Sequence, residues 1–148
     1  MAANDMTFNL YKTKATKKSL VLELSEGEDI LACIEQSMRD NHIDIVEVLQ
    51  MDGIIKEGTI TYFSGNNFRS KSVDGKKPYE VSGRYEIKKG KFTGNCHIVF
   101  KENISLLTAS PSTLVATDGF KVVLSFHEVQ VLNPRTEELT ENDIEKGV

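Results

Sequence analysis

Hydrophobic and polar positions along the chain follow two different periods, and the change between them locates the first elements. Residues 19–24 alternate with a period of two, which is typical of a strand with one buried face. Residues 28–39 follow the period of an amphipathic helix, whose apolar positions are Ile30, Leu31, Ile34 and Met38. The chain is therefore expected to leave a strand, turn at Gly27 and enter a helix within a few residues.

Polar residues on either side of the helical segment predict how the helix is capped. Ser25 and Glu28 have the spacing of a capping box, in which each side chain accepts a hydrogen bond from the backbone N–H group of the other residue. Asn41 is the candidate for the left-handed residue that ends the helix. Local chemistry thus predicts both ends of the helix.

Later segments that alternate, or that are rich in β-branched residues, predict further strands. They are residues 43–52, 58–64, 79–87, 92–100 and 120–131, with residues 6–14 as a candidate edge strand. The first of them is rich in Ile and Val and is expected to be largely buried. Residues 88–91, with Gly90 in the turn, predict a hairpin between two of the strands.

Two segments are harder to assign. Residues 104–116 contain Pro111, and strand and loop both stay open for them. Residues 64–78 are polar and rich in Gly and Asn, which predicts a loop. With these assignments we expect an α+β fold, a single compact domain in which a mostly antiparallel sheet is flanked by one or a few helices.

Charge is distributed unevenly and divides the chain into three parts. Residues 1–18 form a basic segment, residues 19–132 the folded domain, and residues 133–148 an acidic tail. The net charge of −4 argues against a protein whose entire surface binds phosphate backbones. Two local clusters are candidates for phosphate contacts, with ordinary solvated surface as the alternative. They consist of Lys12, Lys14, Lys17 and Lys18, and of Arg69, Lys71, Lys76 and Lys77.

No motif in the sequence names a chemical reaction. It contains no glycine-rich phosphate loop, and no nucleophile–His–Asp triad can be proposed from spacing. It contains neither an apolar run of membrane-spanning length nor the start of a signal peptide. Cys33 and Cys96 are expected to be reduced thiols. We therefore expect a cytoplasmic protein without a cofactor or a membrane contact, and a binding protein more readily than an enzyme.

Four motifs occur in an order that resembles a known family. In residues 20–31 a strand runs into Gly-Glu-Asp-Ile-Leu, and in residues 79–87 an aromatic-Glu-aliphatic-Ser segment leads to a glycine. Residues 95–100 form a strand around His97, and residues 120–126 resemble a closing strand. Together they resemble the plants-and-prokaryotes-conserved (PPC) domain family, in its prokaryotic type without an AT hook.

The resemblance implies an assembly and a function. It implies a homotrimer that associates with DNA or with transcription regulators. Plant members grip the minor groove with an AT hook beside the domain, but this chain contains no Arg-Gly-Arg-Pro core. DNA contact through phosphates is therefore the leading expectation, and docking onto a partner protein is a further one.

The resemblance also draws attention to His97. Prokaryotic members often have two histidines at this i, i+2 spacing, and a third from a later segment, as a candidate divalent-metal site. Asn95 takes the first position here and the third falls near Thr113, so His97 is the one remaining ligand and no metal is expected. Alternation places Asn95 and His97 opposite Cys96. As the alternative function, the chain is a small-molecule or divalent-metal binding protein, or an enzyme, with a pocket at a subunit interface around His97. The pocket residues are His97, Asn95, Arg84 and Thr113.

Two further groups of residues allow two interpretations each. Phe68 beside Arg69 is a candidate for stacking on a nucleic-acid base, and packing onto its own domain is the alternative. One face of residues 79–87 is polar and predicts either a site or a row of residues that faces solvent or forms salt bridges between subunits. That face consists of Glu80, Ser82, Arg84 and Glu86.

Overall fold

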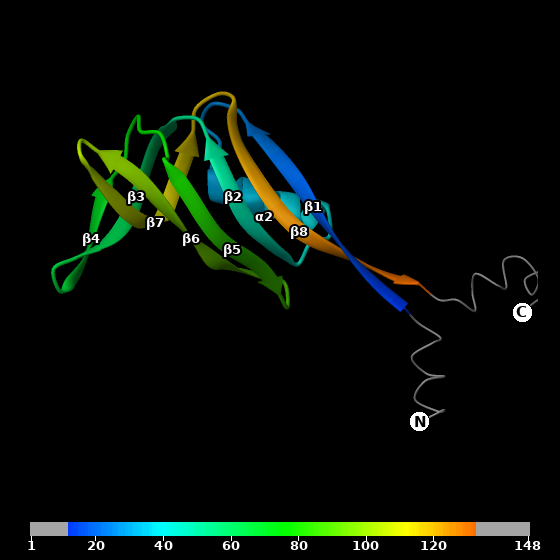
Figure 1. Cartoon of the computed structure of the whole chain (residues 1–148). Helices are drawn as coiled ribbons and strands as arrows, with labels where there is room; N and C mark the ends of the chain where they lie inside the picture. The colour runs from blue at the N-terminus through cyan, green and yellow to red at the C-terminus, as the bar shows by residue number, and fades with distance from the viewer. Residues whose placement is uncertain (1–11, 133–148) are drawn as a thin grey trace, which may run out of the picture. The chain divides into compact units, whose positions relative to one another are not determined.

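The computed structural model describes residues 12–132, and nine elements follow one another within them (Figure 1). In chain order they are β1 Lys12–Leu24, α2 Ile30–Asp40, β2 Ile45–Asp52, β3 Ile55–Ser64, β4 Asn67–Ser72, β5 Glu80–Lys88, β6 Lys91–Glu102, β7 Ser105–Ala116 and β8 Phe120–Leu132. The expected fold class, a mostly antiparallel sheet with one helix, is confirmed for this part of the chain.

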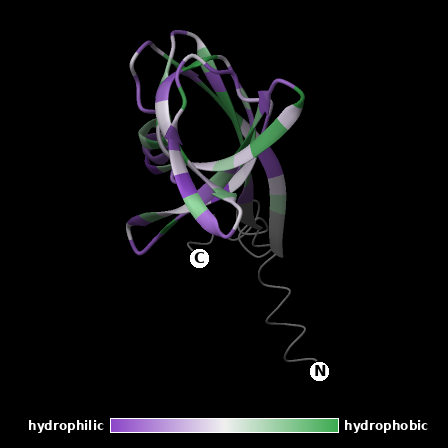
Figure 2. Ribbon diagram, turned by 90° about the vertical axis from the view of Figure 1, so that its left-hand side faces the viewer, coloured by the Kyte–Doolittle hydropathy of each residue, from purple (hydrophilic) through white to green (hydrophobic). Residues whose placement is uncertain are grey.

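The strands form one sheet in the order β1-β8-β2-β5-β6-β7-β3-β4. Antiparallel pairing links β2 with β5 and β8, β3 with β4 and β7, and β6 with β5 and β7. Hairpins join β3 to β4, β5 to β6 and β6 to β7, whereas β2 lies between two strands that are distant in sequence. Figure 2 shows hydrophilic and hydrophobic residues alternating along the curved strands.

The chain divides into two units, Lys18–Phe126 and the two chain ends. The first unit contains α2 and the hydrophobic core. Of the second, residues 12–17 and 127–132 are described, and they are parts of β1 and β8. The predicted boundary at residue 18 falls inside β1. Residues 6–11 of the candidate edge strand and the acidic tail, residues 133–148, lie outside the described residues.

The core forms where one stripe of α2 meets one face of the sheet. Ile30, Ile34 and Met38 of the helix are fully buried. The sheet contributes residues at alternate positions, among them Val46, Ile98, Phe100, Leu114 and Leu124. We call the face with these residues the inner face and the opposite one the outer face. Since only Val46, Val48 and Met51 of β2 are buried, the expectation that this strand is largely buried is wrong.

The predicted N-terminal cap of the helix is wrong by four residues. Asp29 is the N-cap, and its Oδ1 accepts a hydrogen bond from the backbone N–H of Ala32 at 3.0 Å. Ser25 and Glu28 do interact, because the N–H of Ser25 donates to Glu28 Oε1 at 2.6 Å. This contact closes the turn before the helix, so Ser25 itself caps nothing.

The C-terminal end also differs by one residue from the prediction. Asn41 has a φ of −102°, and the left-handed residue is His42, with a φ of 55°. The N–H of Ile43 donates to the carbonyl of Met38 at 2.8 Å, and that of His42 to the carbonyl of Arg39 at 3.3 Å. These two bonds form a Schellman motif, in which glycine is the usual left-handed residue.

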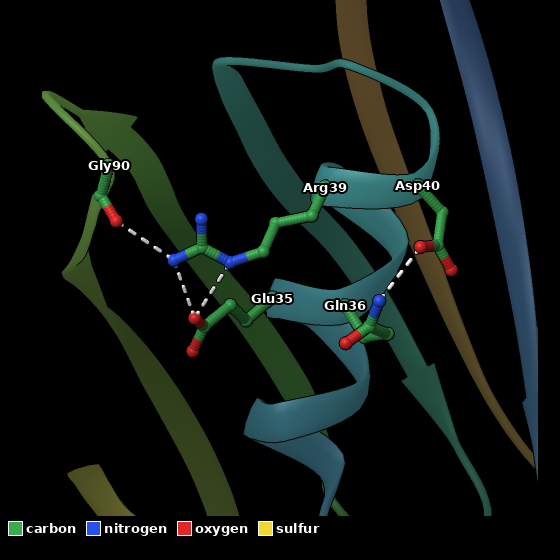
Figure 3. Close-up of polar contacts among 5 residues, drawn as sticks. All are labelled: Glu35, Gln36, Arg39, Asp40 and Gly90. Carbon is green, nitrogen blue, oxygen red and sulfur yellow. Dashed lines mark hydrogen bonds and ion pairs between the residues drawn. The ribbon is translucent and has the colours of Figure 1, made fainter.

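The predicted β5–β6 hairpin is confirmed, and α2 holds its turn. Lys89 and Gly90 both have positive φ, as a two-residue turn of this type requires. The Arg39 guanidinium donates to Glu35 one helical turn away and to the carbonyl of Gly90 at 3.0 Å (Figure 3). The helix and the hairpin are thereby linked through one side chain.

Two segments correct the assignments made from the sequence. Residues 67–72, inside the predicted loop, form β4. The ambiguous residues 104–116 form β7 despite Pro111, which pairs with Ile60 beside a register shift in the β3–β7 ladder. Proline is tolerated at such an irregularity because a regular ladder hydrogen bond is already absent there.

Candidate functional site

The strand around His97 places its polar residues on the outer face, as predicted. Cys96, Ile98 and Phe100 are buried, whereas Asn95 and His97 are exposed. A third residue, Ser110 of β7, joins the two. Its hydroxyl accepts from Asn95 Nδ2 at 3.2 Å and lies 3.4 Å from His97 Nδ1. Sequence reasoning missed Ser110 because Pro111 obscured the alternation of β7.

The other two predicted pocket residues lie on neighbouring strands. Arg84 of β5 pairs with Asn95 across the strands, and it forms no ion pair within residues 12–132. Thr113 of β7 pairs with Thr59, and its Oγ1 accepts a hydrogen bond from the Thr59 N–H at 3.0 Å. Arg84 thus adds an available cation beside Asn95, while the Thr113 hydroxyl is bonded to β3.

Cys96 cannot join His97 in binding a metal, because the two side chains lie on opposite faces of β6. The Tyr85 hydroxyl donates to Cys96 Sγ at 3.3 Å inside the core. Burial raises the pKa of the Cys96 thiol, which keeps it protonated at neutral pH. Within residues 12–132 no group of three His, Cys, Asp or Glu side chains could hold a metal ion.

Acidic residues partly neutralise the predicted basic cluster after β3. Glu102 of β6 pairs with Lys71 and lies 3.6 Å from Lys76. The hydrogen bond from the Lys71 ammonium lowers the pKa of the Glu102 carboxyl. Lys77 lies 3.6 Å from Asp52. No local pattern in the sequence could have found Glu102, because it is 31 residues from Lys71 in the chain.

The remaining predicted phosphate contacts differ in what surrounds them. Arg69 is exposed and has no acidic partner within residues 12–132. In β1, Lys17 and Lys18 are exposed. Lys12 and Lys14 belong to the same strand. Arg69 is therefore the cation of the second cluster that an external anion can approach most directly.

The hairpin of β3 and β4 exposes two aromatic rings near its turn. Phe63 and Phe68 are cross-strand partners, and their rings meet edge to face with centroids 5.1 Å apart. Their exposed fractions are 61% and 75%. Phe68 therefore contacts Phe63 without being covered by the domain, and Phe63 is a residue that sequence reasoning missed.

A shallow cavity of about 350 Å³ lies between β2 and the start of β5. It is lined by Leu49, Gln50, Met51, Tyr79, Glu80 and Val81. The β2–β5 register extends only to Val48 and Gly83, so the two strands diverge beside the cavity. The predicted pocket residues do not line it, and of the polar row on β5 only Glu80 does.

Comparison with protein families decides the assignment. The family model of the Plants and Prokaryotes Conserved domain matches residues 11–127, most of the chain. The chain belongs to this family. The resemblance inferred from the four motifs is thus confirmed, and the sheet described above is a PPC domain. Comparison with curated proteins finds no match.

Solved structures with the same fold include three from prokaryotes. A metal-containing protein of Archaeoglobus fulgidus has a TM-score of 0.64 and 14% identity, over 82% of this chain and 86% of its own. A PPC protein of Pyrococcus horikoshii has a TM-score of 0.62 and 14% identity, over 79% and 82%. A candidate DNA-binding protein of Ralstonia eutropha has a TM-score of 0.60 and 19% identity, over 73% and 76%.

These likenesses establish only the fold of this PPC domain, because sequence identities below 25% give no information on the roles of single residues. The described part of the chain also contains no helix that is both long and apolar enough to cross a bilayer.

Proposed function

We propose that this PPC domain is a non-enzymatic, cytoplasmic binding protein that contacts DNA through phosphate groups, without an AT hook. The observation that supports it best is Arg69, which is exposed and has no acidic partner within residues 12–132. A guanidinium matches the oxygens of a phosphate with two parallel hydrogen bonds. The description of the Ralstonia relative as a candidate DNA-binding protein adds support from the family.

The proposed contacts fall into two groups. Arg69, Lys71, Lys76 and Lys77 belong to the β3–β4 hairpin and the segment after it, and Lys12, Lys14, Lys17 and Lys18 belong to β1. Each group would contact the DNA backbone and read no bases, since phosphate contacts contain no sequence information.

Fluorescence anisotropy with a labelled DNA duplex tests the proposal. Phosphate contacts release counterions, so affinity should fall steeply between about 50 and 200 mM salt. The double variant Arg69→Gln/Lys77→Gln should bind more weakly and lower the slope of log K against log salt by about one to two. A second variant with Gln at positions 12, 14, 17 and 18 tests the β1 group in the same way.

The matched control removes two charges elsewhere. Lys88→Gln/Lys91→Gln changes the net charge equally at the β5–β6 hairpin, where both residues are exposed. Affinity that falls equally in control and test variants would contradict a hairpin site. Full affinity in all of the variants would contradict phosphate binding by these residues.

A second candidate function is the binding of a small polar ligand on the outer face. It is favoured by the grouping of Asn95, His97 and Ser110, beside an Arg84 without an ion pair in the described residues. Thr113 would contribute only if its bond to β3 opened. The affinity for a neutral ligand here would depend little on salt, whereas the affinity for DNA would fall steeply as the salt concentration rises. NMR signals of the His97 ring during a ligand titration would detect it.

A further inference from the structure

Hydrogen bonds and strand pairing join the β3–β4 hairpin to the strand around His97 along the outer face. Thr61 of β3 pairs with Ser110 of β7, and its hydroxyl lies 3.4 Å from that of Ser70 in β4. Ser110 in turn contacts Asn95 and His97 of β6. Polar side chains of β4, β3, β7 and β6 thus form one continuous surface.

The two exposed phenylalanines lie on this same face. Phe63 is two residues from Thr61 in β3, and Phe68 is two residues from Ser70 in β4, so alternation places both rings beside the hydroxyl groups. Exposed fractions of 61% and 75% leave most of both rings in water. A flat apolar partner that binds here would remove these rings from water, which favours binding.

The charges of the outer face lie around this surface. Hydroxyl, amide and imidazole side chains lie beside the phenylalanines. Arg69 follows Phe68 in β4, the last strand of the described sheet, so alternation directs its side chain to the opposite face from the two rings, at the open edge of the sheet. Acidic residues lie on β2, on β5 and toward the start of β3; they are Glu47, Glu80, Glu86 and Glu57. An anion is therefore favoured at the open edge of β4 beside Arg69. On β5 the carboxylates disfavour it, except beside Arg84.

We infer that the outer face of β4, β3, β7 and β6 is a platform for single-stranded nucleic acid, an inference that rests on the proposed function. Two bases stack on Phe68 and Phe63, and the polar edge of a base reaches Ser110 and Asn95. The backbone passes over the open edge of β4, where Arg69 contacts a phosphate from the opposite face. Aromatic rings on a sheet bind bases of any sequence because every base has a flat π-face.

The dimensions of the platform agree with this ligand. Neighbouring strands are about 4.8 Å apart, so β4 to β6 spans roughly 15 Å. RNA-recognition-motif domains stack two or three bases on a sheet of this width. A duplex hides the faces of its bases in its own stack, and it could use only the phosphate contacts.

Anisotropy titrations with matched oligonucleotides test the inference. The probes are single-stranded DNA, single-stranded RNA and a DNA duplex, each of about 12 nucleotides or base pairs. We expect the single strands to bind more tightly than the duplex. Phe68→Ala should weaken single-strand binding by about tenfold, with the salt slope unchanged, because stacking releases no counterions. Phe68→Trp should retain the affinity, and Arg69→Gln should lower the slope.

A matched control and a direct readout complete the design. Val21→Ala removes exposed apolar surface from β1, at the other end of the strand order, and should leave affinity unchanged. The NMR signals of the His97 ring should shift when the oligonucleotide is added. A preference for RNA over DNA, or the reverse, supports the platform and shows whether the 2′-hydroxyl is contacted.

Other outcomes separate the two proposals. Equal affinity for duplex and single strand, with no effect of Phe68→Ala, overturns the platform and leaves phosphate binding intact. Absence of binding to all of the probes overturns both proposals. If Phe68→Ala changes the number of subunits and not the affinity, the pair is a contact between copies of the chain, and the platform is overturned.

Discussion

At the scale of the residue, Gly83 decides how closely two strands approach. It pairs with Cys96, and a Cβ built on it would lie 2.3 Å from Cys96 Cβ and 2.6 Å from the Asn95 carbonyl oxygen. These neighbours are a small core side chain and backbone, so they cannot move aside as the end of a long side chain could. The motif that contains Gly83 is thus explained by packing and not by a turn.

The first prediction concerns this position. Gly83→Ala should lower the free energy of unfolding by about 2–3 kcal/mol, because β5 and β6 must separate to admit a methyl group. Urea denaturation followed by circular dichroism measures the change. The neighbouring Ser82→Ala, on the exposed face, should stay within about 0.5 kcal/mol of the wild type. A Gly83→Ala protein of unchanged stability would mean that the two strands separate without cost.

The second prediction concerns Cys33, the other thiol. It is half-buried in α2, and its Sγ lies 3.6 Å from Glu28 Oε2. Burial and the nearby carboxylate raise the pKa of this thiol, so little thiolate exists at pH 8. Glu28→Gln should lower that pKa and speed the reaction with Ellman's reagent between about pH 7 and 9. Glu35→Gln, which lies in α2 like Cys33, serves as the control. An equal rate in all three proteins would show that the Glu28 charge has no influence on Cys33.

At the scale of the element, the ends of α2 show what local patterns can and cannot predict. The helix and its buried stripe follow from the spacing of apolar residues, and both were predicted. The cap residues were not, because Asp29 and His42 compete with equally suitable neighbours at Ser25 and Asn41. Which residue acts as the cap depends on where the chain leaves β1 and enters β2, and a short stretch of sequence does not contain that information.

The third prediction uses this correction. His42 has a φ of 55°, which strains a side chain with a Cβ, and it is exposed. His42→Gly should raise the free energy of unfolding by about 0.5–1 kcal/mol, since relief of strain exceeds the added freedom of the unfolded chain. Asn41→Gly should destabilise the protein, because Asn41 Nδ2 donates to the Ser37 carbonyl. Thermal unfolding of both variants gives the comparison, and stabilisation by Asn41→Gly instead would overturn the assignment of the cap.

The strands show the same division between local and distant information. The alternation of β5 and β6 predicted which residues face the core, since both strands pack one face on it. β4 is an edge strand whose six residues are exposed or only partly buried, so it has no apolar face to alternate with. Ser110 escaped prediction because Pro111 obscured the alternation of β7, and Glu102 because its partner Lys71 is 31 residues away in the chain.

At the scale of the whole molecule, several large apolar side chains stay exposed in the described residues. Phe63, Phe68, Ile104 and Leu106 are all more than half exposed. A set of this kind is common where a protein meets another surface. The homotrimer implied by the family is one such assembly, and it stays a proposal for this chain.

The fourth prediction is the subunit number. Native mass spectrometry of the untagged protein should give a species of three times 16.6 kDa. Dilution should leave the trimer intact if it buries an interface of standard size, about 1,600 Å² or more. A single copy at all concentrations would contradict the trimer. Additional mass on the trimer would indicate a bound ligand and favour the second candidate function.

Glu102 gives the basic cluster of Arg69, Lys71, Lys76 and Lys77 a property that no single lysine has. The carboxylate of Glu102 already occupies Lys71 and Lys76, and it is tied to the same chain, so it never diffuses away. An anion from solution that binds these two lysines must therefore displace the Glu102 carboxylate. A mononucleotide has too few phosphate charges to displace Glu102, whereas a polymer with a phosphate on every nucleotide presents many charges at once. The pairing with Glu102 would thus act as a threshold that selects long polyanions over small ones.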